Sequence, residues 1–307
     1  MRLLHTSDWH LGRSFHGVGM LDAQRNFIEQ LLSVIREQSV DVVLIAGDVY
    51  DRALPGLDVV KLLDDALVRI TDAGAKVVLT SGNHDSAIRL GFASRLLERG
   101  GVHLRTRVED LDSPVLFGLD GNGAGSAKPD APVLAVYGIP YLEPRLVAER
   151  LGVQTASHFD VTRAAVQLIR EDIARRSESG PVHSVVLAHT FASGGITSDS
   201  ERDLSIGGLG AVPWISSMDL ATRLWVTFTG SQELSEHVRY SGSPLAYSFS
   251  EARHRKGAWL IDVGADGVGN VEEILWKAPR ELAILRGKLA ELLELEEYRW
   301  AESAYCR

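Results

Sequence analysis

Apolar residues occur in two alternating spacings along the first hundred positions of the chain. Unbroken apolar runs at residues 3–4, 42–45 and 77–79 are typical of buried strands. Between them, apolar residues recur at helical spacing over 27–35 and over 58–72, where Asp58 is the predicted N-cap. This repeated strand–helix–strand order predicts neighbouring, mostly parallel strands joined by right-handed crossovers.

Later parts of the chain alternate less regularly. Strands are predicted at 133–138 and 185–187, a helix over 161–176 and a flexible surface loop at the glycine-rich stretch 121–129. Short apolar runs at 238–240, 259–263 and 271–275 follow one another without long helices, which predicts a second sheet packed on the first. From 279 to 297 the leucine spacing predicts one amphipathic helix, whose apolar face requires a partner.

Polar residues that can bind metal or transfer protons follow four of the apolar runs. In chain order they are Asp8 and His10, Asp48, Asn83 and His84, and His189. In open α/β sheets, ligands bind beyond the carboxyl ends of the strands. We therefore expect these side chains to converge at one edge.

The donor types predict a site for a pair of cations. Asp8 and His10 are alternate residues, so in a regular strand both would point the same way and could hold one cation. A single carboxylate such as Asp48 can bridge two metals, and Asn83 and His189 offer further ligands. His84 is suited to proton transfer or to stabilising developing negative charge. Carboxylate, amide and imidazole ligands without thiolate favour Mn²⁺ over structural zinc.

Each cluster has an ordinary structural alternative when it is taken alone. Asp-x-His is common, Gly-Asp after a strand is often a turn, and His189 could be a core histidine. Asp85 could be the N-cap of a helix over 87–97. Four such clusters in this order, each after a buried strand, favour the metal site.

Composition sets the broad class of the protein. The chain has 307 residues, 45% hydrophobic and 24% charged, as in ordinary globular proteins. Its net charge of −9 argues against an open basic surface as the main source of nucleic-acid affinity. One cysteine, Cys306, excludes an internal disulfide and predicts a reducing cytoplasm. We find no membrane-spanning stretch, and charged residues interrupt any signal peptide.

The order of these motifs resembles that of the calcineurin-like metallophosphoesterases, and within them the SbcD-type nuclease subunits of bacterial SbcCD complexes. The segments that carry the resemblance are residues 1–12, 46–52, 81–86, 239–245 and 248–251. The resemblance implies an α/β fold in which a two-sheet β-sandwich is flanked by helices. It also implies a nuclease domain at 1–278 and, at 279–307, the truncated beginning of a C-terminal capping and partner-docking segment.

The resemblance implies that two cations activate water for hydrolysis of DNA phosphodiesters in recombination, replication and repair. The ions would be Mn²⁺, with Mg²⁺ possible. Asp8 and His10 would hold one cation, Asp48 would bridge, Asn83 and His189 would hold the second, and His84 would assist the leaving group. Such subunits trim double-stranded ends 3′ to 5′, cut single strands and open hairpins. Their partners would be DNA, an SbcC-type ATPase and a second copy of the nuclease subunit.

The chain departs from the family at the last motif. Thr227 and Thr229 stand where a Gly-His-x-His motif is expected, so each cation would lose one imidazole ligand. A shifted reading frame over codons for residues 225–230 can encode Gly-His-Leu-His-Gly, which favours a frame-shifted segment at about 216–229 over true divergence. Asp219 or Arg223 could then face the core unpaired, which predicts disorder or reduced stability across 214–230.

These observations leave three functions open. The first is a DNA nuclease that needs two cations. The second is a catalytically impaired subunit that binds DNA ends or the ATPase without cleaving. The third is a phosphodiesterase for small nucleotides on the same fold.

Overall fold

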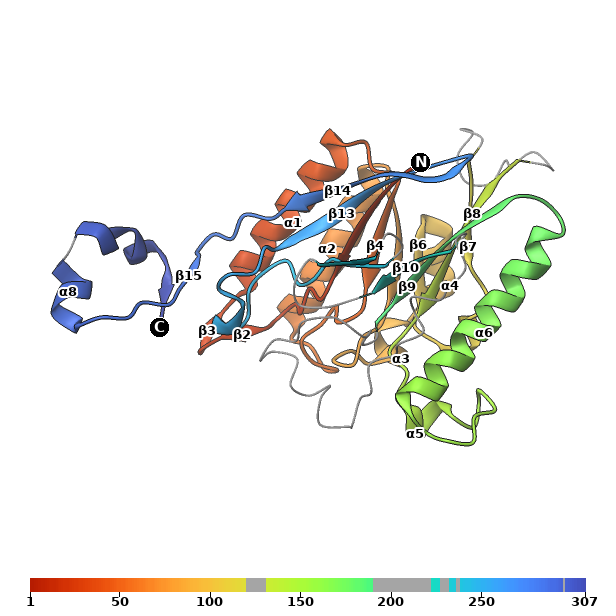
Figure 1. The fold of residues 1–307 in the computed structure, drawn as a ribbon, viewed down its shortest axis with the longest axis horizontal. Coiled ribbons are helices and arrows are strands. Elements are labelled where there is room, and N and C mark those ends of the chain that lie inside the picture. Colours follow the sequence, from red (N-terminus) through yellow and green to blue (C-terminus); the bar gives the residue numbers. More distant parts are fainter. Residues whose placement is uncertain (120–130, 190–221, 227–231, 236–237, 295) are drawn as a thin grey trace.

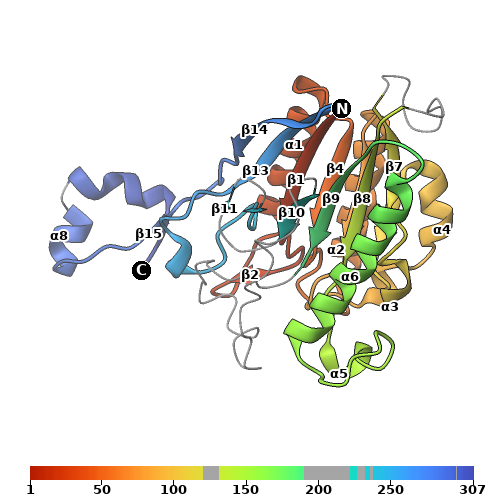
Figure 2. The same ribbon diagram turned by 45° about the vertical axis from the view of Figure 1, so that its right-hand side comes forward.

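Two stacked β-sheets with helices on their outer faces form the body of the protein in this computed structural model (Figures 1 and 2). The structure describes residues 1–119, 131–189, 222–226, 232–235, 238–294 and 296–307. Within these residues the main strands form two six-stranded sheets, with orders β14-β13-β1-β4-β5-β6 and β11-β12-β10-β9-β8-β7. The predicted α/β fold with two sheets is confirmed.

Parallel strands form the centre of the first sheet, and an antiparallel pair extends it. The parallel strands are β1 (Arg2–Ser7), β4 (Val42–Ala46), β5 (Lys76–Thr80) and β6 (Val102–Arg105). The antiparallel strands are β13 (Gly257–Gly264), which pairs with β1, and β14 (Gly267–Leu275). The crossover helices are α1 (Leu21–Glu37) and α2 (Leu57–Asp72).

The second sheet is built mainly on four parallel strands. In chain order its strands are β7 (Val115–Gly118), β8 (Val133–Ile139), β9 (Val182–Ala188), β10 (Thr222–Val226), β11 (Gln232–Ser235) and β12 (Val238–Tyr240). β8, β9, β10 and β12 run parallel, and β10 lies between β9 and β12. The helix α6 (His158–Ser177) covers the outer face of this sheet (Figure 2).

Alternation along the strands divides the core into layers. Leu4 packs toward α1 and α2, where Phe27 and Leu63 are buried. Its neighbour Leu3 faces the opposite way and packs with Val185 and other residues of the second sheet. Successive strand residues point to opposite faces, so β1 contributes to both layers.

The last two long strands differ from the prediction. Residues 259–263 and 271–275 were expected in the second sheet, but β13 and β14 belong to the first, where Leu4 lies opposite Leu260. Only the short β12 joins the second sheet. Local apolar patterns indicate strands but carry no information about which distant strand each one pairs with.

The predicted single helix over 279–297 is wrong. The structure has β15 (Leu282–Ala283), α8 (Leu289–Glu294), a 3₁₀ helix (Glu296–Ser303) and β16 (Tyr305–Cys306), which pairs with β15. This segment projects away from the sheets (Figure 1), and Leu289 and Leu293 are exposed. Without a buried face to pack against, a short leucine-rich helix gains little stability in water.

Helix starts also differ from the prediction. α2 begins at Leu57 with Gly56 at the N-cap, so Asp58 lies in the first turn. The expected helix over 87–97 is two short helices, α3 (Ala87–Leu90) and α4 (Ser94–Leu97), and α3 is capped by Ser86. The other short elements are β2 (Ser14–Phe15), β3 (Val18–Gly19), α5 (Pro144–Val147) and 3₁₀ helices at Glu98–Gly100, Val108–Asp110 and Phe249–Glu251. Across the described ranges no helix has the length and apolarity that a bilayer crossing requires.

Candidate metal centre

The polar clusters lie just beyond the carboxyl ends of four strands. Asp8 and His10 follow β1, Asp48 follows β4, Asn83 and His84 follow β5, and His189 follows β9 of the other sheet. Asp8, His10, Asp48 and His189 are all at most 5% exposed. Residues separated by up to 181 positions in the sequence therefore meet at one place, where the two sheets come together.

Asp48 is the centre of this cluster. One of its carboxylate oxygens, Oδ2, lies 3.7 Å from Nε2 of His10 and 3.6 Å from Nε2 of His189. The other, Oδ1, accepts a hydrogen bond of 2.9 Å from the backbone amide of His84. One carboxylate therefore contacts groups from three other loops.

Two groups of potential metal ligands share Asp48. The first is His10, Asp48 and His84, and the second is Asp8, Asp48 and His189; within each group the donor atoms lie within 4.8 Å of one another. Asn83 adjoins the second group, since its Oδ1 accepts a hydrogen bond of 2.9 Å from Nε2 of His189. Oxygen and imidazole donors without thiolate fit Mn²⁺ and related divalent ions. The donors present therefore fit a pair of divalent cations.

Asp8 and His10 do not extend β1 as a regular strand, which is how their spacing was interpreted. β1 ends at Ser7, and both residues have left-handed backbone angles, with φ of 50° and 43°. Asp48 has the same unusual conformation, with φ of 41°. Such angles are uncommon for residues other than glycine and concentrate at functional sites. In this turn Asp8 groups with His189 and His10 with His84.

Two glycines allow the loops to approach this closely. A Cβ on Gly47 would lie 2.1 Å from Nδ1 of His189, and a Cβ on Gly82 would lie 2.0 Å from Oδ1 of Asp48. Gly47 also has φ of 67°, a conformation that side chains disfavour. The Gly-Asp and Gly-Asn pairs are therefore required by the packing of the ligands themselves.

Hydrogen bonding determines which nitrogen of His84 is free to act. Nδ1 of His84 lies 2.9 Å from the backbone carbonyl oxygen of Asp51. A carbonyl can only accept, so Nδ1 carries the proton in this contact and Nε2 remains as the second nitrogen. The ring also packs edge-on against His10, with ring centroids 4.9 Å apart.

Two further carboxylates near the site were not identified as site residues from the sequence. Asp85 accepts hydrogen bonds from the backbone amides of Val49, Tyr50 and Gly82, at 3.0, 2.9 and 2.9 Å. It therefore ties the β5 loop to the β4 loop and does not cap a helix. Asp51 lies 3.8 Å from Nδ1 of His10. In the sequence, the only signal that Asp51 belongs to the site was its position three residues after Asp48.

Burial and charge act against each other at the site. Burial lowers the pKa of His10 to about 3, opposed by the charge of Asp48. Burial also lowers the pKa of His189. For Asp48 burial favours the neutral form, but the surrounding imidazoles, His189 foremost, hold its pKa below the ordinary value. Burial and then the charge of Asp48 raise the pKa of Asp85 to about 7. Neutral imidazoles and an ionised bridging carboxylate are the forms that bind metal.

The replaced motif lies outside the described residues. This holds for Thr227, Thr229 and Asp219, and for most of the stretch 214–230 for which disorder was expected. Within that stretch, β10 forms a central strand, and Val226 lies opposite Ala188, the residue before His189. The backbone alone of Arg223 is described, so its expected burial stays a prediction.

Comparison with known proteins identifies the family. The family model described as calcineurin-like phosphoesterase matches residues 1–206. A curated relative from Staphylococcus epidermidis, named as the D subunit of the nuclease SbcCD, is 26% identical over 303 residues, which are 96% of this chain and 74% of the relative.

Solved structures of low similarity also align with most of the chain. A dimetal phosphatase from Danio rerio is 10% identical with a TM-score of 0.46, covering 90% of this chain and 99% of that one. The protein TT1561 of Thermus thermophilus is 13% identical with a TM-score of 0.45, covering 89% and 98%.

Proposed function

Because this chain belongs to the calcineurin-like phosphoesterases, a family of metal-dependent hydrolases, we propose that it is a DNA nuclease subunit of SbcD type. The observation that carries the proposal is the pair of ligand groups that share the buried Asp48, beyond the carboxyl ends of strands from both sheets. The similarity to a relative named as a nuclease subunit over 96% of the chain supports the choice of substrate.

We assign the roles in this site as follows. Asp8, His10, Asp48, Asn83 and His189 hold two divalent cations, which we propose are Mn²⁺, or Mg²⁺ in its place. When bound, such cations lower the pKa of water and stabilise charge on a phosphodiester. With its Nδ1–H held by the carbonyl of Asp51, a doubly protonated His84 would direct its Nε2–H at the charged phosphate or give that proton to the leaving oxygen. The proposed reactions on DNA are 3′–5′ exonuclease digestion of double strands, endonuclease cleavage of single strands and the opening of hairpins.

A catalytically impaired subunit is the second candidate, and Thr227 and Thr229 favour it. Both residues follow the central strand β10 in the sequence, at the place of the two histidines of the family motif. Hydroxyl groups cannot replace neutral imidazole as ligands of similar strength. In this case the chain would bind DNA ends or the ATPase without cleaving.

Manganese-dependent cleavage of a hairpin DNA by the wild type and by the double variant Thr227→His/Thr229→His tests these proposals. If the chain is a nuclease, the wild-type protein cleaves the hairpin. If it is an impaired subunit, only the double variant, in which both imidazoles are restored, cleaves it. Thr155→His, at an exposed position, is the matched control and should change nothing. Cleavage of a small chromogenic diester but of no DNA would identify a small-nucleotide phosphodiesterase. Absence of cleavage and of Mn²⁺ binding in both proteins would refute the metal site.

The partners proposed for this chain are DNA, an SbcC-type ATPase and a second nuclease subunit. We also propose that residues 1–278 are the nuclease domain and that 279–307 begin a capping and docking segment. Exposed Leu289, Leu293 and Trp300 in that segment support this division, since such side chains in a projecting segment suit a protein partner. The proposed cellular setting is DNA recombination, replication and repair in the cytoplasm.

A further inference from the structure

The loop after β1 carries two of the proposed ligands in a conformation that its own residues disfavour. Asp8 and His10 both have positive φ, and so does Gly12, two residues further along the same loop. Backbone bonds tie one side of it to the β4 loop, from the amide of His10 to the carbonyl of Asp48 and from Leu11 to Val49, both at 2.9 Å. Strained residues persist only where surrounding contacts hold them. The other side of the loop must therefore be held as well.

Gln24 holds the loop through all of its side-chain hydrogen-bonding groups. It lies on the buried face of α1 and has no exposed surface. Its Nε2 donates to the carbonyl of His10 at 2.7 Å and to the hydroxyl of Tyr247 at 3.0 Å. Its Oε1 accepts from the amide of Gly12 at 2.9 Å. Both N–H groups and the carbonyl oxygen of the Gln24 side chain are therefore hydrogen-bonded. Two of these bonds go to the loop and one goes to Tyr247, which also contacts the loop.

Tyr247 holds the residue between the two ligands. Its hydroxyl donates to the carbonyl of Trp9 at 2.8 Å while it accepts from Gln24. Its ring lies edge-on to His10, with centroids 5.7 Å apart, and under the guanidinium of Arg13, 5.2 Å away. Burial raises the pKa of the phenol well above its ordinary value, so the proton that it donates stays in place. Its sequence separation of 238 residues from Trp9 hid this contact from any local pattern.

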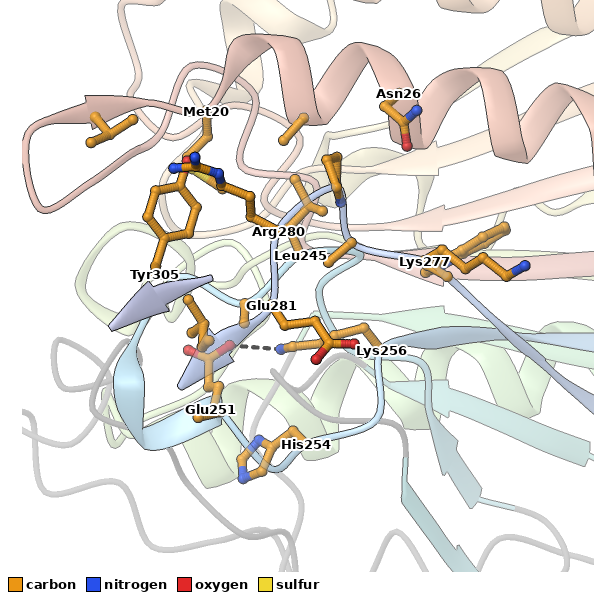
Figure 3. Close-up of a pocket in the computed structure, with 18 of the residues that line it drawn as sticks. Met20, Asn26, Leu245, Glu251, His254, Lys256, Lys277, Arg280, Glu281 and Tyr305 are labelled. Atoms are coloured by element: carbon orange, nitrogen blue, oxygen red, sulfur yellow. Dashed lines mark hydrogen bonds and ion pairs between the residues drawn. The ribbon is translucent and has the colours of Figure 1, made fainter. Parts of the chain in front are cut away.

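A buried ion pair anchors the segment that presents Tyr247. The ammonium of Lys256 donates to Glu251 at 2.6 Å and to the hydroxyl of Ser243 at 2.8 Å, and Glu251 also accepts from the amide of Tyr247 at 3.4 Å. Figure 3 shows the ion pair among the side chains that line a cavity. The cavity has a volume of about 1180 Å³, and Met20, the residue before α1, also lines it. The support behind Tyr247 is therefore itself buried and bonded.

From this geometry we propose that Gln24 and Tyr247 are positioning residues of the metal centre. Their side chains hold the backbone of residues 8–12 so that Asp8 and His10 face the shared Asp48. The inference rests on the proposed metal site. Groups that orient metal ligands commonly change metal affinity by about 10–100-fold when they are removed.

The test compares Tyr247→Phe and Gln24→Met with the wild type. Each variant removes polar atoms and keeps a side chain of similar size. Tyr137→Phe is the matched control, because it also removes one hydroxyl from a fully buried tyrosine, on β8, where the hydroxyl donates to Asp172. Two properties are measured: binding of Mn²⁺ alone by titration calorimetry, and amide hydrogen exchange of residues 8–13 in the metal-free protein.

Both variants should lose about tenfold or more in Mn²⁺ affinity, and the amides of His10, Leu11 and Gly12 should exchange at least about tenfold faster. The control should keep its affinity and its loop exchange within about twofold. Unchanged exchange in both variants overturns the inference, whether or not the protein binds metal. Faster exchange with unchanged Mn²⁺ affinity also overturns it, because the loop would then be held for stability alone. A wild type that binds no Mn²⁺ refutes the proposed function, and the exchange data then decide separately whether the loop is held.

Discussion

Replacing Gly82 by alanine tests how closely the β5 loop approaches the shared carboxylate. The new Cβ would lie 2.0 Å from Oδ1 of Asp48 and 2.2 Å from its backbone nitrogen, whereas real Cβ atoms essentially never come within 3.0 Å. One of the two loops must therefore move by about 1 Å, the difference between 3.0 and 2.0 Å. The backbone of Asp48 cannot yield as a flexible side chain would, since its carbonyl accepts from the amide of His10 at 2.9 Å.

The expected cost follows from the size of that shift. Overpacking of a well-packed site costs about 1–3 kcal/mol. For a chain of this size that lowers the melting temperature by roughly 2–10 °C. Because Asp48 belongs to both ligand groups, Mn²⁺ affinity should fall by about 10–100-fold. That loss equals about 1.4–2.7 kcal/mol of binding free energy, which is comparable with the cost in stability.

Calorimetric melting and Mn²⁺ titration of Gly82→Ala measure both effects. Gly100→Ala is the control, because its Cβ would meet no atom within 4 Å, and it should change the free energy of unfolding by less than about 0.5 kcal/mol. A Gly82→Ala protein that melts within about 1 °C of the wild type and keeps its Mn²⁺ affinity would refute the close approach on which the site depends.

Three further variants test the charges around this site and in the core. Burial lowers the pKa of His5 to about 3, so only the unfolded chain binds its proton between pH 6.5 and 3; below pH 6.5 stability should fall by about 1.4 kcal/mol per pH unit. Urea unfolding of His5→Leu should lack that contribution, and equal pH slopes in the two proteins would contradict it. Asp48→Asn keeps the acceptor for the His84 amide but removes the negative charge. At a Mn²⁺ concentration 100-fold above Kd, the wild type should gain about 2.7 kcal/mol in free energy of unfolding. Thermal-shift assays should show no such gain for the variant. Asp85→Ala leaves three backbone amides without their acceptor and should lower the free energy of unfolding by about 3 kcal/mol or more, whereas Asp85→Asn should lose less.

Much of the fold and the positions of the candidate ligands could be predicted from local patterns. The strand-then-ligand order at Asp48 and His189 was readable because parallel strands deliver their carboxyl ends to one edge of a sheet. The placement of β13 and β14 was not, because an apolar strand pairs equally well with several partners until the chain is folded. Gln24 left one usable signal, a polar residue in the apolar stripe of α1 with Phe27 and Leu31.

The amino-acid sequence by itself determined the strands of the two main sheets other than β6, β7, β10 and β11, the two crossover helices, and the types of side chain that follow the strands β1, β4, β5 and β9. These are consequences of periodicity and residue chemistry, which act over a few neighbouring positions. Tertiary structure alone decided that Asp8 groups with His189 and His10 with His84, that Asp85 joins two loops, and that Tyr247 supports the backbone of Trp9. Those relations depend on left-handed turns and on contacts between residues up to 238 positions apart, which only the packed sheets bring within hydrogen-bonding distance.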